Sequence, residues 1–240
     1  TSLLLSPFLF YHNTTQEWKN CEKIEKNLQK CVKIRISNVG VRLCVRPSCT
    51  DTKGTAMRTI TTVEMNPDSR EEYLPGYTPQ FPHIASHIDG RLYQSDVAPW
   101  HWHESVELFY VRRGSILYRT PHAEHVVHAG CGGMVNSHIL HTTKILDPSL
   151  DMALHLFSPS LVAGVAGGTV EQRYIRPLTA DAGHELILLT PDDPAQTETL
   201  RRIDESLRLD EAAFGHEMRL QAMLTDIWLR LVEQVCPPEH

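Results

Sequence analysis

The stretch that decides the fold is PWHWHESVELFYVRRG, residues 99–114. Its central part is predicted to form a strand that ends in a turn at Gly114. Side chains along a strand point alternately to opposite faces. One face is therefore predicted to carry His101, His103, Glu107, Phe109 and Val111, and the other Trp102, Glu104, Val106, Leu108 and Tyr110.

Two histidines and a glutamate on one strand face form a set of nitrogen and carboxylate donors. Such a set can bind a divalent ion such as Zn, Mn, Fe or Ni if a fourth ligand comes from a neighbouring strand. The candidate for that ligand is His141, in the segment NSHILH. Two alternatives need no ion: a hydrogen-bonded polar wall inside the protein, or a pH sensor built from the histidines.

Short strands are expected on both sides of this stretch, from residue 81 to about 160. Turn-forming residues separate them at the close spacing of a sandwich or small barrel. The predicted strands are GRLYQSDV (90–97), HESVELFYV (103–111), GSILYRT (114–120), EHVVHAG (124–130), GMVNS (133–137), HTTKIL (141–146) and DMALHLFS (151–158).

Two helices are predicted after the strands. Asp193 is expected to be the N-cap of the first, with Pro194 in its first turn and Gln196 as the capping-box partner. A second helix is expected to start near Asp210 and to align a stripe of apolar side chains. This stripe predicts a homodimer, and the alternative is that it packs on its own barrel. Its members are Leu220, Leu224, Ile227 and Leu231.

The first 56 residues differ from the rest of the chain in charge. They hold nine Lys and Arg against four Asp and Glu, a net of +5, whereas residues 57–240 hold 14 against 25, a net of −11. An acidic body argues against direct binding of nucleic acid. The apolar run LLLSPFLF is too short to span a bilayer. Residues 1–56 are therefore expected to be a poorly ordered or non-native leader, with Met57 as the natural start.

The motif H-x-H, three residues, E, six residues, G resembles the first motif of the cupin barrels. It comprises His101, His103, Glu107 and Gly114, and His141 stands where the second cupin motif supplies a histidine. Over residues 80–235 the chain resembles the N-terminal sensor domain of AraC-type bacterial transcription regulators. The resemblance implies a mainly β fold, with a cupin-like barrel (a double-stranded β-helix) over residues 81–175. It also implies a helical dimerisation region over residues 176–240, and residues 57–80 are expected to be a polar lead-in.

This resemblance implies a function in binding and not in catalysis. A small-molecule effector, a sugar or another metabolite, would bind His101, His103, Glu107, Phe109 and His141 and act through the helix pair. No cofactor is required, although the four His and Glu residues could hold a metal. DNA would be bound only by a C-terminal domain that this chain lacks, in a cytoplasmic protein without membrane contact. The alternative is a metal-dependent cupin enzyme, an isomerase or a dioxygenase.

Overall fold

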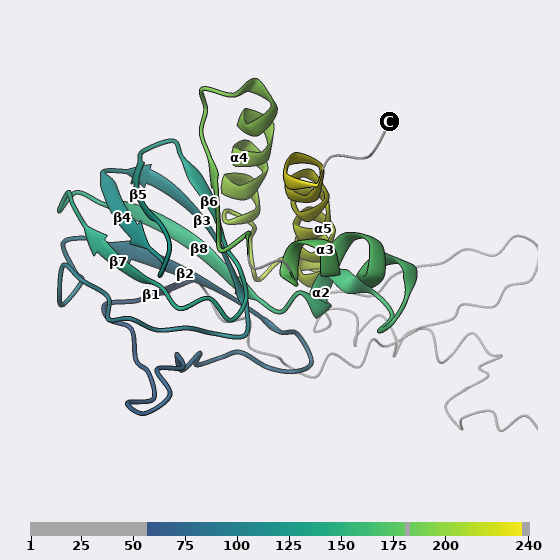
Figure 1. The fold of residues 1–240 in the computed structure, drawn as a ribbon, viewed down its shortest axis with the longest axis horizontal. Coiled ribbons are helices and arrows are strands. Elements are labelled where there is room, and N and C mark those ends of the chain that lie inside the picture. The colour runs from purple at the N-terminus through teal and green to yellow at the C-terminus, as the bar shows by residue number, and fades with distance from the viewer. Residues whose placement is uncertain (1–56, 181–182, 237–240) are drawn as a thin grey trace, which may run out of the picture. The chain divides into compact units, whose positions relative to one another are not determined.

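The computed structural model describes residues 57–180 and 183–236, so the predicted leader, residues 1–56, lies outside the described residues. The predicted class, mainly β followed by C-terminal helices, is confirmed (Figure 1). The strands are β1 Arg58–Thr59, β2 His83–Asp89, β3 Val106–Arg113, β4 Ser115–Arg119, β5 Glu124–His128, β6 Gly132–Val135, β7 Thr142–Ile145, β8 Asp151–Phe157 and β9 Leu186–Leu189. The helices are α2 Ser160–Ala163, the π-helix η1 Glu171–Ile175, α3 Arg176–Thr179, α4 Pro194–Ser206 and α5 His216–Val235.

The strands form two sheets that enclose a common apolar core. The six-stranded sheet has the order β1-β2-β8-β3-β6-β9 and the three-stranded sheet the order β5-β4-β7. Phe109 of β3 and Met152 of β8 share one buried cluster with Ile116 and Tyr118 of β4 and Val127 of β5. Because inward side chains from both sheets meet there, any ligand site of the domain that lies between the sheets is lined by strands of both.

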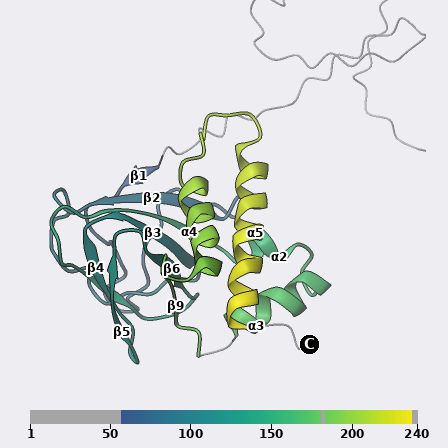
Figure 2. The same cartoon turned by 90° about the horizontal axis from the view of Figure 1, so that it is seen from above.

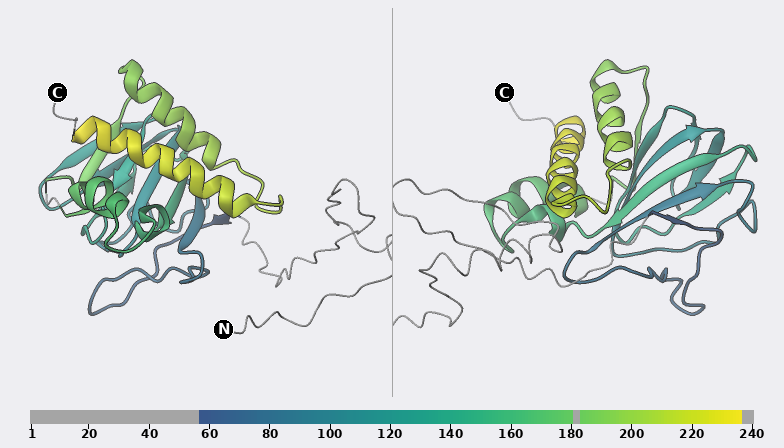
Figure 3. Two further views of the ribbon diagram at one scale, coloured as in Figure 1. Left: turned by 90° about the vertical axis from the view of Figure 1, so that its right-hand side faces the viewer. Right: turned by 180° about the vertical axis from the view of Figure 1, so that it is seen from behind.

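The other face of the six-stranded sheet is covered by the helices. Val106 and Leu108 of β3 and Phe157 of β8 point to this side and pack with α4 and α5. Figure 2 shows α4 and α5 side by side next to the sheet, and Figure 3 shows them crossing its face. Strand β3 is therefore buried on both faces, and the alternation predicted for its side chains separates a core between the sheets from a core under the helices.

The apolar stripe of α5 lies in this second core. Each of its four residues is at most 1% exposed in the single chain. The arrangement observed is thus the alternative in which the stripe packs on its own domain, because the apolar outer face of the sheet has to be covered. These side chains are not free to form the predicted dimer contact. They are Leu220, Leu224, Ile227 and Leu231.

Several expected elements differ from the structure. Residues 90–97, predicted as a strand, form turns that follow β2, and Leu92 N–H bonds the carbonyl of Asp89. Helix α5 begins at His216 and not near Asp210, after Gly215 at φ 79°. Asp193 is the N-cap of α4 as predicted, but Gln196 accepts a hydrogen bond from Thr190 N–H and not from the N-cap.

The segment 176–240, expected to be helical, contains strand β9, which pairs with β6. This pairing requires glycine in β6, because a Cβ atom on Gly133 would lie 2.2 Å from the carbonyl oxygen of Ile187. The short helices between residues 160 and 179 were not predicted either. Among the described residues, no helix combines the length and the apolar character that a membrane span requires.

Candidate functional site

The predicted site residues come from three places in the fold. Glu107 lies on β3, but His101 and His103 precede this strand, which begins only at Val106. His141 immediately precedes β7. His101 and His141 are joined by an isolated antiparallel bridge, in which each backbone N–H bonds the other's carbonyl at 2.9 Å. This bridge, and not a continuous strand, brings the two sequence motifs together.

Backbone carbonyls orient all three imidazole rings. The Nδ1 atom of His101 lies 2.8 Å from Pro99 O, that of His103 lies 2.8 Å from Ser105 O, and that of His141 lies 2.9 Å from Ile139 O. A carbonyl oxygen only accepts hydrogen bonds, so each Nδ1 carries the proton. In the neutral ring the Nε2 atom is then left with a free lone pair, which is the form that a metal ligand needs.

The free Nε2 atoms point at one another and at a carboxylate. The three histidines are buried, and their ligand atoms lie within 4.8 Å of one another. Glu107 Oε2 lies 3.7 Å from Nε2 of His103 and 3.7 Å from Nε2 of His141. Both of these Nε2 atoms are buried without a hydrogen-bond partner. Because lone pairs and a carboxylate repel each other, a positive species between these atoms, a proton or a cation, would stabilise this arrangement.

A proton is a poor candidate for that species at His101. Burial, together with the neighbouring His141, lowers the pKa of His101 to about 3. For Glu107, burial raises the pKa, but His103 and His141 outweigh it and hold the pKa well below its usual value. His101 is therefore neutral and Glu107 is a carboxylate anion at neutral pH, which are the protonation states that bind a divalent cation.

Tyr118 of β4 supports the glutamate from the opposite sheet. Its hydroxyl donates a 2.6 Å hydrogen bond to Glu107 Oε1. Burial and the charge of Glu107 raise the pKa of Tyr118 well above its usual value, so the phenol keeps its proton. Phe109, a predicted ligand-binding residue, stacks on Tyr118 with 4.4 Å between the ring centroids. It lines neither of the two cavities that are described below.

A second glutamate, Glu72, reaches the cluster from the predicted lead-in. Its Oε2 atom lies 3.9 Å from His101 Nε2, and its side chain is 10% exposed. Burial, and secondarily the charge of Glu107, raise the pKa of Glu72 to about 8. Sequence reasoning missed both Glu72 and Tyr118. The alternation of GSILYRT could have placed Tyr118 inside, whereas no local pattern distinguishes Glu72 from its exposed neighbour Glu71.

Two cavities adjoin the cluster. The inner cavity, about 30 Å³, is lined by His101, Glu107, His141 and Tyr118 among others. The outer cavity, about 280 Å³, lies between the segment 58–75 and the strands β2 and β8. Ile60, Glu72 and Leu156 line both cavities, so they separate the outer space from the histidines.

The remaining histidines of the motif region do not join the cluster. His122, His125 and His128 are exposed, as expected for residues at a turn and an edge strand. A separate buried pair, His83 of β2 and His155 of β8, lies on the helix side of the sheet and was not predicted.

Comparison with known proteins agrees with the motifs. Residues 83–227, which include β2 to β9 and most of α5, match the family described as AraC-like ligand binding domain. The chain belongs to this family. No curated protein matches this AraC-like domain at a significant level.

Solved structures similar to this AraC-like domain include regulators and a cupin. An apo form of ToxT from Vibrio cholerae strain SCE256 is 9% identical with a TM-score of 0.45, and the match covers 63% of this chain and 56% of ToxT. The AraC-like transcriptional activator CuxR is 14% identical with a TM-score of 0.40, over 57% of this chain and 45% of CuxR. A cupin-2 domain protein from Shewanella frigidimarina is 12% identical with a TM-score of 0.26, over 35% and 76%. The chain thus spans about half the length of the two regulators.

Proposed function

We propose that this AraC-like domain is the effector-sensing part of a cytoplasmic bacterial transcription regulator, and that it holds a divalent metal ion at His101, His103, Glu107 and His141. The observation that carries the metal proposal is the convergence of unpartnered, buried Nε2 atoms on a carboxylate. Donor atoms that share one ion at about 2.1 Å lie within about 4.2 Å of one another. The distances of 3.7 Å from Glu107 Oε2 to the Nε2 atoms of His103 and His141 meet this condition. The ligand atoms of the three histidines, which lie within 4.8 Å of one another, would move closer together to share the ion.

Binding is favoured over catalysis by the match to the AraC-like ligand binding domain. The cavity beside the cluster, about 30 Å³, has room for about one water molecule. The bound ion would supply a positive centre for an anionic or oxygen-bearing effector, while Tyr118 and the three backbone carbonyls hold its ligands in place.

A titration with Zn²⁺ tests the metal proposal. The full chain, expressed without a metal-binding tag and stripped with a chelator, is expected to bind one equivalent of Zn²⁺ at neutral pH. Isothermal calorimetry would show this as a single binding step with a stoichiometry of one. Binding of less than about a tenth of an equivalent at micromolar concentration would contradict the proposal.

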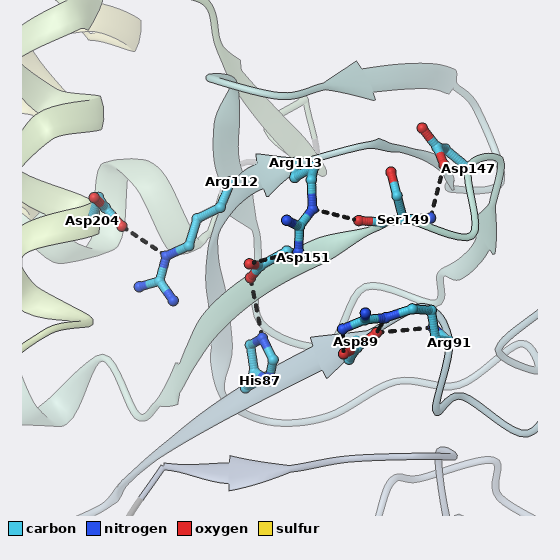
Figure 4. Close-up of polar contacts among 9 residues, drawn as sticks. All are labelled: His87, Asp89, Arg91, Arg112, Arg113, Asp147, Ser149, Asp151 and Asp204. Carbon is cyan, nitrogen blue, oxygen red and sulfur yellow. Dashed lines mark hydrogen bonds and ion pairs between the residues drawn. The ribbon is translucent and has the colours of Figure 1, made fainter.

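Polar contacts link the sensing sheet to the helix pair. Arg112 of β3 donates a 2.9 Å hydrogen bond to Asp204 of α4, and the neighbouring Arg113 bonds Ser149 O at 3.0 Å (Figure 4). His155 of β8 contacts Ser206 at the end of α4 at 3.0 Å. Because β3 also carries Glu107, a change at the cluster is expected to reach α4 through the same strand.

The homodimer is now proposed on the outer face of α5. This face repeats the spacing of the buried stripe with Met218, Ala222, Thr225 and Leu229, and Met218 is 78% and Leu229 41% exposed. Phe214, 75% exposed, precedes the helix and extends the apolar surface. A second copy of the chain is the partner that pairs a helix with an identical stripe across a twofold axis.

The double substitution Met218→Asp and Leu229→Asp is expected to lower the affinity of this dimer by at least about 30-fold, because two charges would be buried between apolar partners. Light scattering across micromolar concentrations measures the change. The control is Val165→Asp, a substitution at an apolar residue that is 79% exposed and does not belong to α5. A wild-type monomer at tens of micromolar, or a dimer insensitive to the double substitution, would rule out this interface.

A further inference from the structure

Glu72 is a buried carboxylate that the four-residue cluster does not require. It comes from the segment 57–80, which precedes β2, whereas the other donors lie on or next to β3 and β7. It also separates the inner cavity at the histidines from the outer cavity. Glu72 therefore lies at the boundary between the two cavities.

Backbone hydrogen bonds place Glu72 over the histidines. Glu72 N–H donates to the carbonyl of Trp102 at 2.9 Å, and Trp102 N–H donates to the carbonyl of Arg70 at 3.1 Å. The indole N–H of Trp102 bonds Ser69 O at 2.8 Å. Trp102 stands between His101 and His103 in the chain, so the segment that carries Glu72 is attached to the segment that carries two of the predicted ligands.

The carboxylate of Glu72 lies at a distance that suits a shared ion. Its Oε2 atom is 3.9 Å from His101 Nε2, which is too long for a hydrogen bond but within the span of two donors on one ion. Glu107 approaches the cluster from His103 and His141, and Glu72 approaches it from His101. Both glutamates line the inner cavity beside the rings.

The outer cavity has the chemistry of a site for a small amphipathic molecule. Its lining includes the apolar side chains of Leu74, Pro75, Ile84 and Leu156, the guanidinium group of Arg58 and the carboxyl groups of Glu64 and Glu72. Its volume of about 280 Å³ is near the lower limit of small-molecule sites, about 300 Å³. Glu72 is the polar side chain among the three residues that line both cavities, so a polar head group in the outer cavity would approach the histidines at its place.

We infer that Glu72 is a displaceable fifth donor to the metal, and that the effector is a small aliphatic or aromatic carboxylate whose head group takes its place while its apolar body fills the outer cavity. This inference rests on the proposed metal site. A carboxylate head group supplies the oxygen donor that Glu72 withdraws, so the exchange leaves the number of donors unchanged.

Cobalt as the probe metal tests this inference in the full chain. Its visible absorption weakens as the coordination number rises from four to five or six, so it reports an added or lost donor. The variant Glu72→Gln is expected to bind Co²⁺ about 10-fold more weakly and to absorb more strongly. It is also expected to bind hexanoate at least about 10-fold more tightly, because the internal competitor is removed. Glu71→Gln is the matched control, since Glu71 is the exposed neighbour of Glu72 on the same segment and lines neither cavity.

The outcomes separate this inference from the metal proposal. If the unmodified chain shows no cobalt band at one equivalent, the metal site and the inference both fail. If the band is present and is lost in His141→Ala, but Glu72→Gln leaves the spectrum and the hexanoate affinity unchanged, only the inference fails. Titration of the unmodified chain with hexanoate needs no substitution, and a cobalt spectrum that does not respond to it would overturn the carboxylate assignment.

Discussion

Replacing His141 by alanine is expected to abolish the gain in thermal stability that Zn²⁺ gives this domain. At a free concentration 100 times its dissociation constant, a bound ion adds about 2.7 kcal/mol to the free energy of unfolding. For a domain of this size that corresponds to about 5–10 °C in the unfolding midpoint. His141 is 1% exposed, and its Nε2 atom has no hydrogen-bond partner, so its loss leaves a buried ion with one nitrogen donor fewer.

The measurement is thermal unfolding with and without Zn²⁺ for each variant. The comparison within one variant removes the stability lost with the hydrogen bond between His141 Nδ1 and Ile139 O. His125→Ala is the control, because His125 belongs to the same histidine-rich region but is exposed on β5. A zinc-dependent gain that persists in His141→Ala and is lost in His125→Ala would place the metal elsewhere.

Acidification is expected to destabilise the domain strongly between pH 6.5 and 4 through the buried pair His83 and His155. The hydroxyl of Ser206 donates to Ile203 O at 2.8 Å, so His155 Nε2–H donates to Ser206 Oγ, and His155 Nδ1 accepts from His83 Nε2–H at 2.8 Å. His155 is therefore neutral in the folded state, because its Nδ1 atom carries no proton.

The sign of the effect follows from the pKa values. Burial, with a contribution from His216, lowers the pKa of His83 to about 3, and burial together with His83 lowers that of His155 well below its usual value. The unfolded chain, with pKa about 6.5, takes up protons first as the pH falls. The stabilisation is complete above about pH 6.5 and is lost below it, by about 1.4 kcal/mol per pH unit for each histidine.

Urea unfolding at pH 7, 6 and 5 measures this dependence. From pH 7 to 5 the pair is expected to cost about 4 kcal/mol, a large part of the 5–15 kcal/mol that stabilises a typical domain. His155→Gln removes one of the two titrating rings and is expected to reduce the slope by about one proton, whatever it does to stability at pH 7. His128→Gln, at an exposed position, should leave the slope unchanged. Equal slopes in the wild type and His155→Gln would refute the assignment.

Local patterns in the sequence were sufficient for the elements that carry the site. The alternation around Glu107 separated the two buried faces of β3, because side-chain direction in a strand depends only on position along it. The N-cap at Asp193 was also identified, since a cap is a contact between residues two or three apart. The sequence also suggested that the two histidine motifs meet. In the structure a backbone bridge between His101 and His141, and not a continuous strand, brings them together.

Other features depend on contacts between distant residues and were decided only by the tertiary structure. Strand β9 forms because the glycines of β6 leave room for it. The sequence of residues 186–189 does not indicate that they pair with β6. The stripe of α5 was recognised as apolar, but periodicity does not indicate whether a sheet or a second chain will cover it. Glu72 lies over the histidines because its backbone pairs with that of Trp102, thirty residues further along. The sequence by itself therefore determined which side chains could form a site, and the long-range pairing of backbone segments decided which of them meet.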